Sequence, residues 1–368
     1  MIRVGIVFGG RSAEHEVSLQ SARNVVDALD RNRYQAVLLG IDKQGRWLHY
    51  ADESRFLENA GDPKRICLAP GGRPVTLLPW GNDGRLVALD PDSGNEEAPL
   101  PQVDVIFPVL HGPLGEDGTI QGLFRLAEVP FVGSGVLGSA AGMDKDAMKR
   151  LFVQAGIPVA PWRLLRSAEE ADFTSLSREF GLPLFVKPAN MGSSVGVHRV
   201  FDREALERAL KDAFRFDLKV LVEKAIPGRE IECSVLGDQD PQASVPGEIV
   251  PNADFYSYEA KYVDEDGAQL IIPARFSRPE LTGRIQDYAI RGFRALCCRG
   301  LARADFFLSD DNEVFLNELN TMPGFTRISM YPKLWDASGI PYPDLIHRLI
   351  QLALTHHARR SNLATSYL

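Results

Sequence analysis

The chain has 368 residues, of which 45% are hydrophobic and 24% charged, and its formal net charge is −8. This length favours two or three domains, and the negative charge argues against nucleic acid or an anionic membrane as a partner. Because the sequence has no signal-peptide pattern and no apolar run of membrane-spanning length, we expect a cytoplasmic protein.

The first segment predicts an α/β domain. An apolar run at residues 3–8 ends in Gly9-Gly10, a helical pattern follows at 17–29, and a second apolar run occupies 34–41. Strand, glycine turn and helix in this order are typical of a doubly wound parallel sheet. Glu14 stands near the start of the helix, where the helix dipole favours an acid, so it could be a helix-start carboxylate without a function.

The next part of the chain combines an elaboration with a candidate ligand-binding loop. Residues 45–101 are rich in Gly, Pro, Asp and Asn, and an Asn-Asp-Gly turn at 82–84 between two apolar runs predicts a hairpin. A buried strand at 103–110 then ends at His111. Polar residues at the carboxyl end of such a strand lie where open α/β sheets bind ligands, although His111 could also be a satisfied loop histidine.

The middle of the chain has a different organisation. A helix is predicted from Asp144 to Gly156, further helices near 167–180 and 203–213, and a strand at 219–224. These elements surround a strand–loop–strand segment. Strands that are joined by hairpins rather than by crossovers indicate an α+β domain.

That strand–loop–strand segment is a candidate phosphate-binding loop. An apolar run ends in Lys187, and the loop after it contains Gly192, Ser193, Ser194 and Gly196. The glycines allow backbone amides to approach an anion, and the serines add hydroxyl donors. The lysine precedes the glycines and no helix obviously follows, so this is neither a Walker loop nor a dinucleotide fingerprint. A surface hairpin that carries one lysine is the alternative.

The following segments offer groups for a nucleoside and for a lid. Glu223, Lys224 and Ile226 stand at a strand end and could form hydrogen bonds to a flat polar ring, while Glu230 could hold a ribose. None of these residues is specific alone. The tract at 252–262 is polar and rich in aromatic residues, and a loop of this length is typical of a lid.

Two predicted strands near the C-terminus carry a candidate metal site. Asp305 lies on the first strand, and Glu318 and Asn320 lie on the second. Glu318 and Asn320 are two positions apart and therefore share one face. Two carboxylates and an amide oxygen form a hard ligand set suited to Mg²⁺ that bridges phosphates. We expect the tail from His356 to be frayed.

Eight motifs in this order resemble the D-alanine–D-alanine ligase family of the ATP-grasp superfamily, over residues 1 to about 350. Each motif alone is weak, whereas the ordered set is specific. The motifs are Gly9-Gly10-Arg11-Ser12-Ala13-Glu14, His111-Gly112 with Gly115-Glu116-Asp117-Gly118, Met143-Asp144-Lys145, Lys187-Pro188 with Gly192-Ser193-Ser194-Val195-Gly196, Glu223-Lys224, Tyr258-Glu259-Ala260-Lys261-Tyr262, Arg303-Ala304-Asp305, and Asn317-Glu318-Leu319-Asn320-Thr321-Met322-Pro323-Gly324.

The resemblance implies a three-domain ATP-grasp fold that combines α/β and α+β parts. Residues 1–140 would form the N-terminal doubly wound parallel-sheet domain, which binds substrate and carries the 45–101 elaboration. Residues 141–230 would form the central subdomain, and residues 231–368 the C-terminal subdomain with the metal site and the lid loop. The family also implies a homodimer.

The resemblance assigns nucleotide and metal roles. Residues for the ATP phosphates and the lid over them would be Lys145, Lys187, Lys261, Ser193 and Ser194. Residues for adenine and ribose would be Glu223, Lys224, Ile226, Glu230 and Phe307, with the phenylalanine packed beneath the ring. Two Mg²⁺ or Mn²⁺ ions would be held by Asp305, Glu318 and Asn320.

The resemblance also implies the reaction. Two D-alanines would be joined through a D-alanyl phosphate, with release of ADP and phosphate, for peptidoglycan precursor synthesis. Glu14 would bind the ammonium of the first D-alanine and His111 would lie near its carboxylate, while Ser329 and Met330 would bind the carboxylate of the second. The catalytic residues would be Glu14, Ser193, Tyr262, Arg303 and Gly324, with Arg303 and the Gly324 amide at the tetrahedral oxyanion.

Two alternatives remain at this point. One is a related ATP-grasp ligase, such as a D-alanine–D-lactate ligase. The other is a nucleotide-binding regulatory protein that has lost catalysis. The regulator predicts gaps in the metal and lysine set, and the sequence has no such gap, because Asp305, Glu318, Asn320 and the three lysines are all present.

Overall fold

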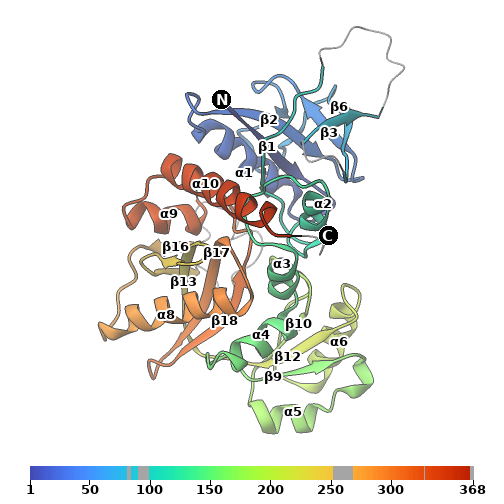
Figure 1. Ribbon diagram of the computed structural model, residues 1–368. Coiled ribbons are helices and arrows are strands. Elements are labelled where there is room, and N and C mark those ends of the chain that lie inside the picture. The colour runs from blue at the N-terminus through green and yellow to red at the C-terminus, as the bar shows by residue number, and fades with distance from the viewer. Residues whose placement is uncertain (81–83, 90–98, 252–267, 327, 365–368) are drawn as a thin grey trace.

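The computed structural model describes residues 1–80, 84–89, 99–251, 268–326 and 328–364. Its elements form three groups, each built around a sheet, that follow one another along the chain (Figure 1). Within these residues, no helix combines the length and the apolar character needed to cross a membrane.

The first group is a six-stranded sheet with the order β7-β6-β3-β2-β1-β8. Its parallel part is β1 (Ile2–Gly9), β2 (Tyr34–Ile41) and β8 (Val105–Pro108), and helix α1 (His15–Ala28) connects the first two strands. Alternating strand and helix with almost continuous apolar runs give this parallel arrangement, as predicted.

The 45–101 elaboration extends the same sheet with antiparallel strands, so the sheet is mixed. The added strands are β3 (Trp47–Tyr50), β6 (Arg73–Leu77) and β7 (Leu86–Ala88). The predicted hairpin is confirmed, because Val75 pairs with Ala88 in antiparallel register. A separate pair, β4 (Leu57–Glu58) and β5 (Cys67–Leu68), lies within the elaboration.

Three helices lead from the first sheet to the second. They are α2 (Thr119–Leu126), α3 (Val136–Met143) and α4 (Lys145–Gln154). Asp144 caps α4, since its carboxylate accepts hydrogen bonds at 3.1 Å from the backbone amides of Asp146 and Ala147. This cap fixes the first turn of α4, which carries Lys145.

The second group is an antiparallel sheet with the order β11-β10-β12-β9. Its strands are β9 (Trp162–Leu165), β10 (Leu184–Pro188), β11 (His198–Val200) and β12 (Val220–Lys224), and α6 (Arg203–Ala213) matches the predicted helix. The helix expected near 167–180 is instead a short 3₁₀ turn, Ala168–Glu170, followed by α5 (Phe173–Phe180). Asp172 caps α5 through two backbone amides and separates the two pieces.

The third group is a sheet with the path β16-β15-β13-β17-β18, to which β14 adds beside β13. The strands are β13 (Gly228–Gly237), β14 (Gln242–Ala243), β15 (Gly247–Pro251), β16 (Ala268–Ile271), β17 (Gly300–Ser309) and β18 (Val314–Asn320), and α8 (Glu280–Ala295) packs on them. Strand β13 runs through residue 230, so the domain boundary placed there from the sequence would divide a strand. The domain limits given from the sequence stay predictions.

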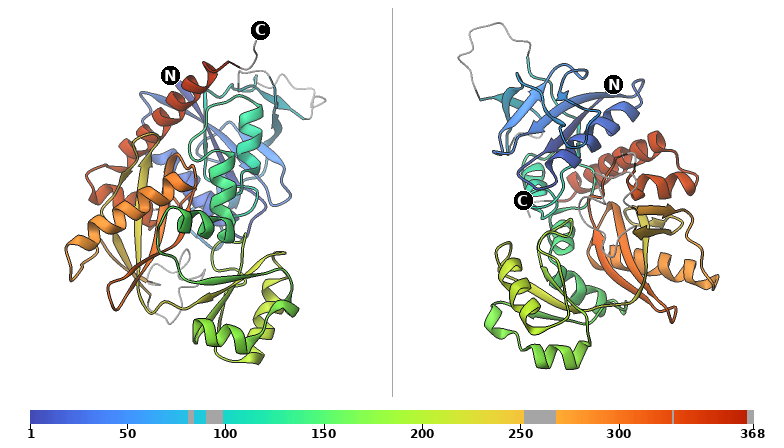
Figure 2. Two further views of the ribbon diagram at one scale, coloured as in Figure 1. Left: turned by 60° about the horizontal axis from the view of Figure 1, so that its bottom comes forward. Right: turned by 180° about the vertical axis from the view of Figure 1, so that it is seen from behind.

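The last helices complete the core of the first sheet. Helix α10 (Tyr342–Ser361) packs against α1 and β8 of the N-terminal group, and α9 (Met330–Ala337) lies between α10 and the third sheet, where it packs on β13 (Figures 1 and 2). Their Tyr331 and Leu345 belong to one buried cluster with Val4 and Phe8, and Phe325 packs edge-on against Phe107 of β8 at 5.7 Å between ring centroids. Since α10 continues to Ser361, the expectation of a frayed tail from His356 is wrong.

Candidate active site

The candidate phosphate-binding loop of the second group contacts the glycine turn of the first. Ser193 Oγ donates a hydrogen bond to Glu14 Oε1. Glu14 is only 6% exposed, and although it precedes α1, its side chain makes no cap hydrogen bond. Glu14 stands at the N-cap position of α1, as the helix-start interpretation expected, but its buried carboxylate contacts the second group instead of capping the helix. The contact brings two predicted site residues from distant parts of the chain together.

Glycines make room for the Glu14 carboxylate. A Cβ atom at Gly112 would lie 3.0 Å from Glu14 Oε2, and one at Gly192 would lie 3.2 Å from the same atom. Gly112 also has a φ of +77°, which side chains rarely adopt. Close approach of two loop backbones to one carboxylate thus explains the glycine at both positions.

His111 is buried at the end of β8 and both its ring nitrogens have protein partners. Nδ1 lies 3.2 Å from the Met322 carbonyl oxygen and Nε2 lies 3.4 Å from Ser21 Oγ. Burial lowers the pKa of His111, so the ring is neutral, with Nδ1–H as donor. The satisfied-histidine alternative describes these contacts, which also join β8 and α1 to the segment after β18.

Glu116 is a site residue to which the sequence analysis gave no role. Its Oε2 accepts a hydrogen bond of 2.7 Å from the Gly112 amide. Burial, together with the negative charge of Glu14, raises the pKa of Glu116 to about 8. The only sequence signal was its place in the Gly-Glu-Asp-Gly motif.

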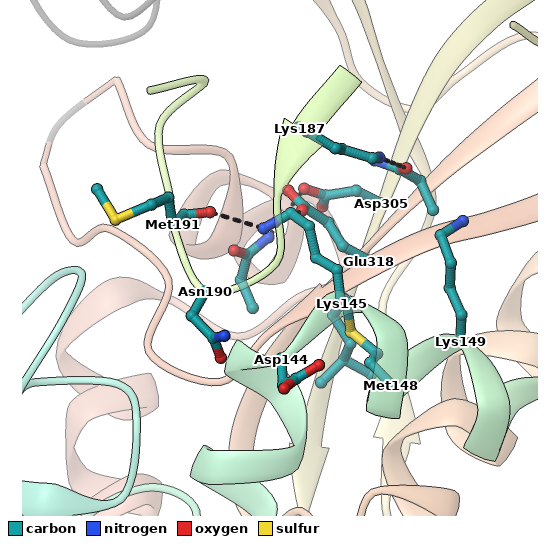
Figure 3. A network of polar contacts seen from close by, with 12 residues as sticks. Asp144, Lys145, Met148, Lys149, Lys187, Asn190, Met191, Asp305 and Glu318 are labelled. Atoms are coloured by element: carbon teal, nitrogen blue, oxygen red, sulfur yellow. Dashed lines mark hydrogen bonds and ion pairs between the residues drawn. The ribbon is translucent and has the colours of Figure 1, made fainter. Parts of the chain in front are cut away.

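Two predicted lysines lie beside Asp305 and Glu318 (Figure 3). Lys145 Nζ donates to the Met191 carbonyl at 2.7 Å and lies 3.6 Å from Glu318 Oε2. Lys187 Nζ lies 2.6 Å from Glu223 Oε2. Both ammonium groups are therefore held by oxygen atoms of the protein itself, at the mouth of the small-residue loop.

Lys149 is a second residue that the sequence analysis missed. It lies one helical turn after Lys145 on α4, is 0% exposed, and its Nζ lies 3.3 Å from Glu223 Oε1. Its spacing of four from Lys145 on the predicted helix was a usable signal, because such residues share a face.

The predicted metal ligands come together across β17 and β18. Asp305 and Glu318 are register partners, and Asn320 Nδ2 donates to Asp305 Oδ2 at 2.9 Å. Arg303 binds both Asp305 oxygens at 2.7 Å and lies 3.0 Å from Glu232 Oε2. In the described ranges, no group of three or more His, Cys, Asp or Glu residues could hold a metal ion.

The residues nevertheless suit a hard cation. Two carboxylates and one amide oxygen are typical Mg²⁺ donors when phosphate and water complete the coordination shell. Binding would require Asp305 to exchange the guanidinium of Arg303 for the ion, and the amide of Asn320 to turn its oxygen inward.

The remaining predicted residues fall into two small sets. Glu230 and Phe307 are register partners on β13 and β17, where a partly buried ring and a carboxyl group could meet a nucleoside. After β18, a Cβ at Gly324 would lie 2.9 Å from Ser329 Oγ. Ser329 Oγ accepts from the Thr326 amide at 3.0 Å and precedes the buried Met330.

For the last predicted site residues we give only their position in the fold, and two of them lie outside the described residues. Lys224 is exposed at the end of β12 and Ile226 is half-buried after it. Ser194 belongs to the small-residue loop and, like Ser193, has a positive φ, which is uncommon outside glycine. Lys261 and Tyr262 lie outside the described residues.

Comparison with known proteins identifies relatives over the whole chain. A model described as D-ala D-ala ligase N-terminus matches residues 3–134, and one described as D-ala D-ala ligase C-terminus matches residues 151–351. A D-alanine–D-alanine ligase of Oceanobacillus iheyensis is 56% identical over 366 residues, which cover 99% of this chain and 98% of that protein.

Solved structures are similar over the same extent. The D-alanine–D-alanine ligase of Coxiella burnetii has a TM-score of 0.83 and 37% identity, with 98% of this chain and 97% of that chain covered. A D-alanine–D-alanine ligase of Bacillus anthracis complexed with ATP has a TM-score of 0.71 and 27% identity, with coverage of 98% and 100%.

Proposed function

Because this chain belongs to the D-alanine–D-alanine ligase family, we propose how its residues join two D-alanines at the expense of ATP. The contact between Ser193 and Glu14 carries this proposal. It connects the loop expected to cover the ATP phosphates with the carboxylate expected to hold an amino acid, so the two reactants would be bound side by side.

In the first step, a carboxylate oxygen of the first D-alanine attacks the γ-phosphorus of ATP. A new P–O bond forms, the bond to the β-phosphate oxygen breaks, and ADP leaves a D-alanyl phosphate. Phosphoryl transfer is catalysed mainly by positioning and by neutralising charge. Glu14 would fix the ammonium of D-alanine, while Lys145 and Lys187 would exchange their protein partners for phosphate oxygens.

Asp305, Glu318 and Asn320 would hold two Mg²⁺ ions, which neutralise charge on the phosphates when bound. Release of Asp305 from Arg303 would leave the guanidinium anchored by Glu232. Arg303 could then face the acyl oxygen of the intermediate.

In the second step, the amine of the second D-alanine attacks the acyl carbon. The C–N bond forms, the C–O bond to phosphate breaks, and the proton that the attacking nitrogen loses is taken up by the departing phosphate. Arg303 and the backbone amide of Gly324 would stabilise the tetrahedral oxyanion. Ser329 and Met330 would bind the carboxylate of this D-alanine, and their position directly after the Gly324 segment supports that role.

Adenosine would lie between the second and third sheets. Glu223, Lys224 and Ile226 at the end of β12 would form hydrogen bonds to adenine, and Phe307 would pack beneath it. Glu230 would bind the ribose. Lys261 and Tyr262 complete the proposed lid, which is needed because an acyl phosphate hydrolyses in water.

The function is tested by the balance of products. With ATP, Mg²⁺ and D-alanine, we expect ADP, phosphate and D-alanyl-D-alanine in equal amounts, and little product from other D-amino acids or from D-lactate. Phosphate release without dipeptide, or an ester as main product, would contradict the proposal. A homodimer and a cytoplasmic location belong to the same proposal, and analytical ultracentrifugation measures the first.

A further inference from the structure

A fully buried lysine lies behind the proposed adenine site without a role in the reaction. Lys149 is 0% exposed, its Nζ lies 3.4 Å from the Ala160 carbonyl oxygen and 3.3 Å from Glu223 Oε1, and the ammonium stands 5.7 Å from the centroid of the Trp162 ring. These neighbours enclose the ammonium. Because burying a charge is costly, a lysine in this place needs a reason beyond packing.

Glu223 joins this lysine to the nucleotide site. The carboxylate is 3% exposed, with Oε1 beside Lys149 and Oε2 at 2.6 Å from Lys187 Nζ. Oε1 is an ion-pair partner of Lys149 but accepts no aligned hydrogen bond from the described part of the chain. One carboxylate is thus shared by two ammonium groups and retains an acceptor position.

The two lysines differ in what they can reach. Lys187 lies one residue before the end of β10, close to the small-residue loop, and its Nζ also lies 3.4 Å from Asn317 Oδ1, so a phosphate could draw it away from Glu223. Lys149 points inward from α4 (Figure 3) and is enclosed, so it stays in place. Of these two lysines, Lys149 is the one that would stay beside Glu223 while ATP is bound.

We propose that Lys149 is the permanent counter-ion of Glu223, which keeps this carboxylate ionised when Lys187 moves to the phosphates and thereby selects adenine over guanine. The inference rests on the proposed function of Glu223 as the adenine ligand. Lys149 is a positioning residue, because it acts through Glu223 and does not touch the substrate.

The selection follows from donor and acceptor chemistry. Adenine presents an amino group as a hydrogen-bond donor at the position where guanine presents the O6 acceptor. An ionised carboxylate only accepts hydrogen bonds, whereas a protonated carboxyl group can donate one. Ionised Glu223 therefore accepts adenine and repels guanine, and a protonated Glu223 would accept both.

The electrostatics of the cluster agree with this role. Burial alone would raise the pKa of Glu223, but the charges of Lys149 and Lys187 outweigh it and hold the pKa below its usual range. Burial lowers the pKa of Lys149 to about 8 against the opposing effect of Glu223. Removal of Lys149 would leave burial unopposed once Lys187 has moved.

The test compares nucleotides within one enzyme sample. Lys149→Met should lower the ratio of kcat/KM for ATP to that for GTP by at least about tenfold, mainly through a higher KM for ATP. Because both nucleotides meet the same sample, the folded fraction cancels from the ratio. Arg150→Met is the matched control, since this neighbour is 64% exposed and pairs with Asp146. An unchanged ratio in Lys149→Met would overturn the inference.

A second variant and a double variant complete the test. Lys149→Gln is also neutral but retains a donor for the Ala160 carbonyl, so it gives the same comparison if the methionine variant does not fold. Glu223→Gln should lower the ratio by itself, and adding Lys149→Met should then change it no further. If the two substitutions instead lowered the ratio independently, so that their effects multiplied in the double variant, the inference would be overturned. A parent enzyme that makes no dipeptide with ATP would instead contradict the proposed function.

Discussion

The end of the site that we propose for the nucleotide and the end that we propose for the amino acid, called here the nucleotide end and the amino-acid end, are built from different interactions. At the nucleotide end, the charged groups are paired: Lys187 with Glu223, Lys145 with Glu318, and Arg303 with Asp305. At the amino-acid end, the contacts are hydrogen bonds to uncharged donors. Ser193 donates to Glu14, the Gly112 amide donates to Glu116, and the buried imidazole is neutral.

This difference indicates how each end receives its ligand. ATP and Mg²⁺ would have to exchange with ion pairs that already exist, so binding at the proposed nucleotide end would replace one charged partner with another. Glu14 has no cation within ion-pair distance in the part of the chain that the structure describes. The ammonium of D-alanine would supply the missing charge, which makes this end selective for a zwitterion.

The largest expected effect is at the metal ligands. Glu318→Gln should lower turnover by about 10³-fold or more, because it removes one anionic ligand and also the partner of Lys145. Turnover is measured across Mg²⁺ concentrations, with the exposed Glu313→Gln as control on the same strand pair. If Glu318→Gln matched the parent at low Mg²⁺, the nucleotide end would not depend on this carboxylate.

Lys187→Ala should reduce turnover by roughly 10²- to 10³-fold, the scale expected for loss of one preorganised charged donor. The KM for D-alanine should change little, because Lys187 belongs to the nucleotide end. Steady-state kinetics in both substrates measure this, with Lys211→Ala on the exposed face of α6 as control. A larger effect on D-alanine than on ATP would abolish the distinction between the two ends.

Glu14→Gln should raise the KM for D-alanine by roughly 10- to 100-fold, as expected for loss of a charged hydrogen-bond partner. The amide still accepts from Ser193, so the loop contact is retained and the KM for ATP should stay within about twofold of the parent. Glu16→Gln is the control, since Glu16 lies on the same helix but pairs with Lys43 at the surface. Equal losses for both substrates would show that Glu14 only supports the fold.

The smallest expected effect concerns stability and pH. Folded Glu116 keeps its proton up to a pKa of about 8, whereas the unfolded carboxyl group releases it near 4.5. Because the folded state binds the proton more tightly, its stability falls as the pH rises between these values. Glu116→Gln should remove this dependence and raise the unfolding midpoint at pH 8.5 by roughly 2 °C.

Thermal unfolding of Glu116→Gln from pH 5 to 8.5 is the measurement. The exposed Glu204→Gln on α6 serves as control. Parallel pH profiles for the parent and Glu116→Gln would mean that Glu116 is not held protonated beside Glu14, and the amino-acid end would then carry a second charge.

Local patterns in the sequence predicted most elements of the fold, and most residues that we propose for the site lie on these elements or at their ends. The helix at Arg203–Ala213, the 75/88 hairpin and the strand pair of Asp305 and Glu318 depend on neighbouring residues and short turns. Periodicity and turn chemistry carry that information. The mixed first sheet also follows once the hairpin is placed at its edge.

Partners across the fold were not predictable in this way. Nothing local at Lys149 indicates that Glu223 of a different strand will face it, and nothing local at Glu14 indicates Ser193. Helix α10 shows the same limit, since its apolar face packs in the core of the N-terminal sheet and His356 near its end pairs with Asp238, which follows β13. These pairings depend on tertiary contacts, which local patterns in a single sequence do not predict.

The last helices of the chain complete the core of its first sheet, so the order of synthesis decides when that core can form. Strands β1 and β2 leave the ribosome about 300 residues before Tyr342, a delay of roughly 15–60 s at usual rates of synthesis. During that interval the face that α10 later covers is open to other chains. The nascent protein therefore has to protect its N-terminal half until translation ends, and chaperones that bind apolar surface are suited to that task.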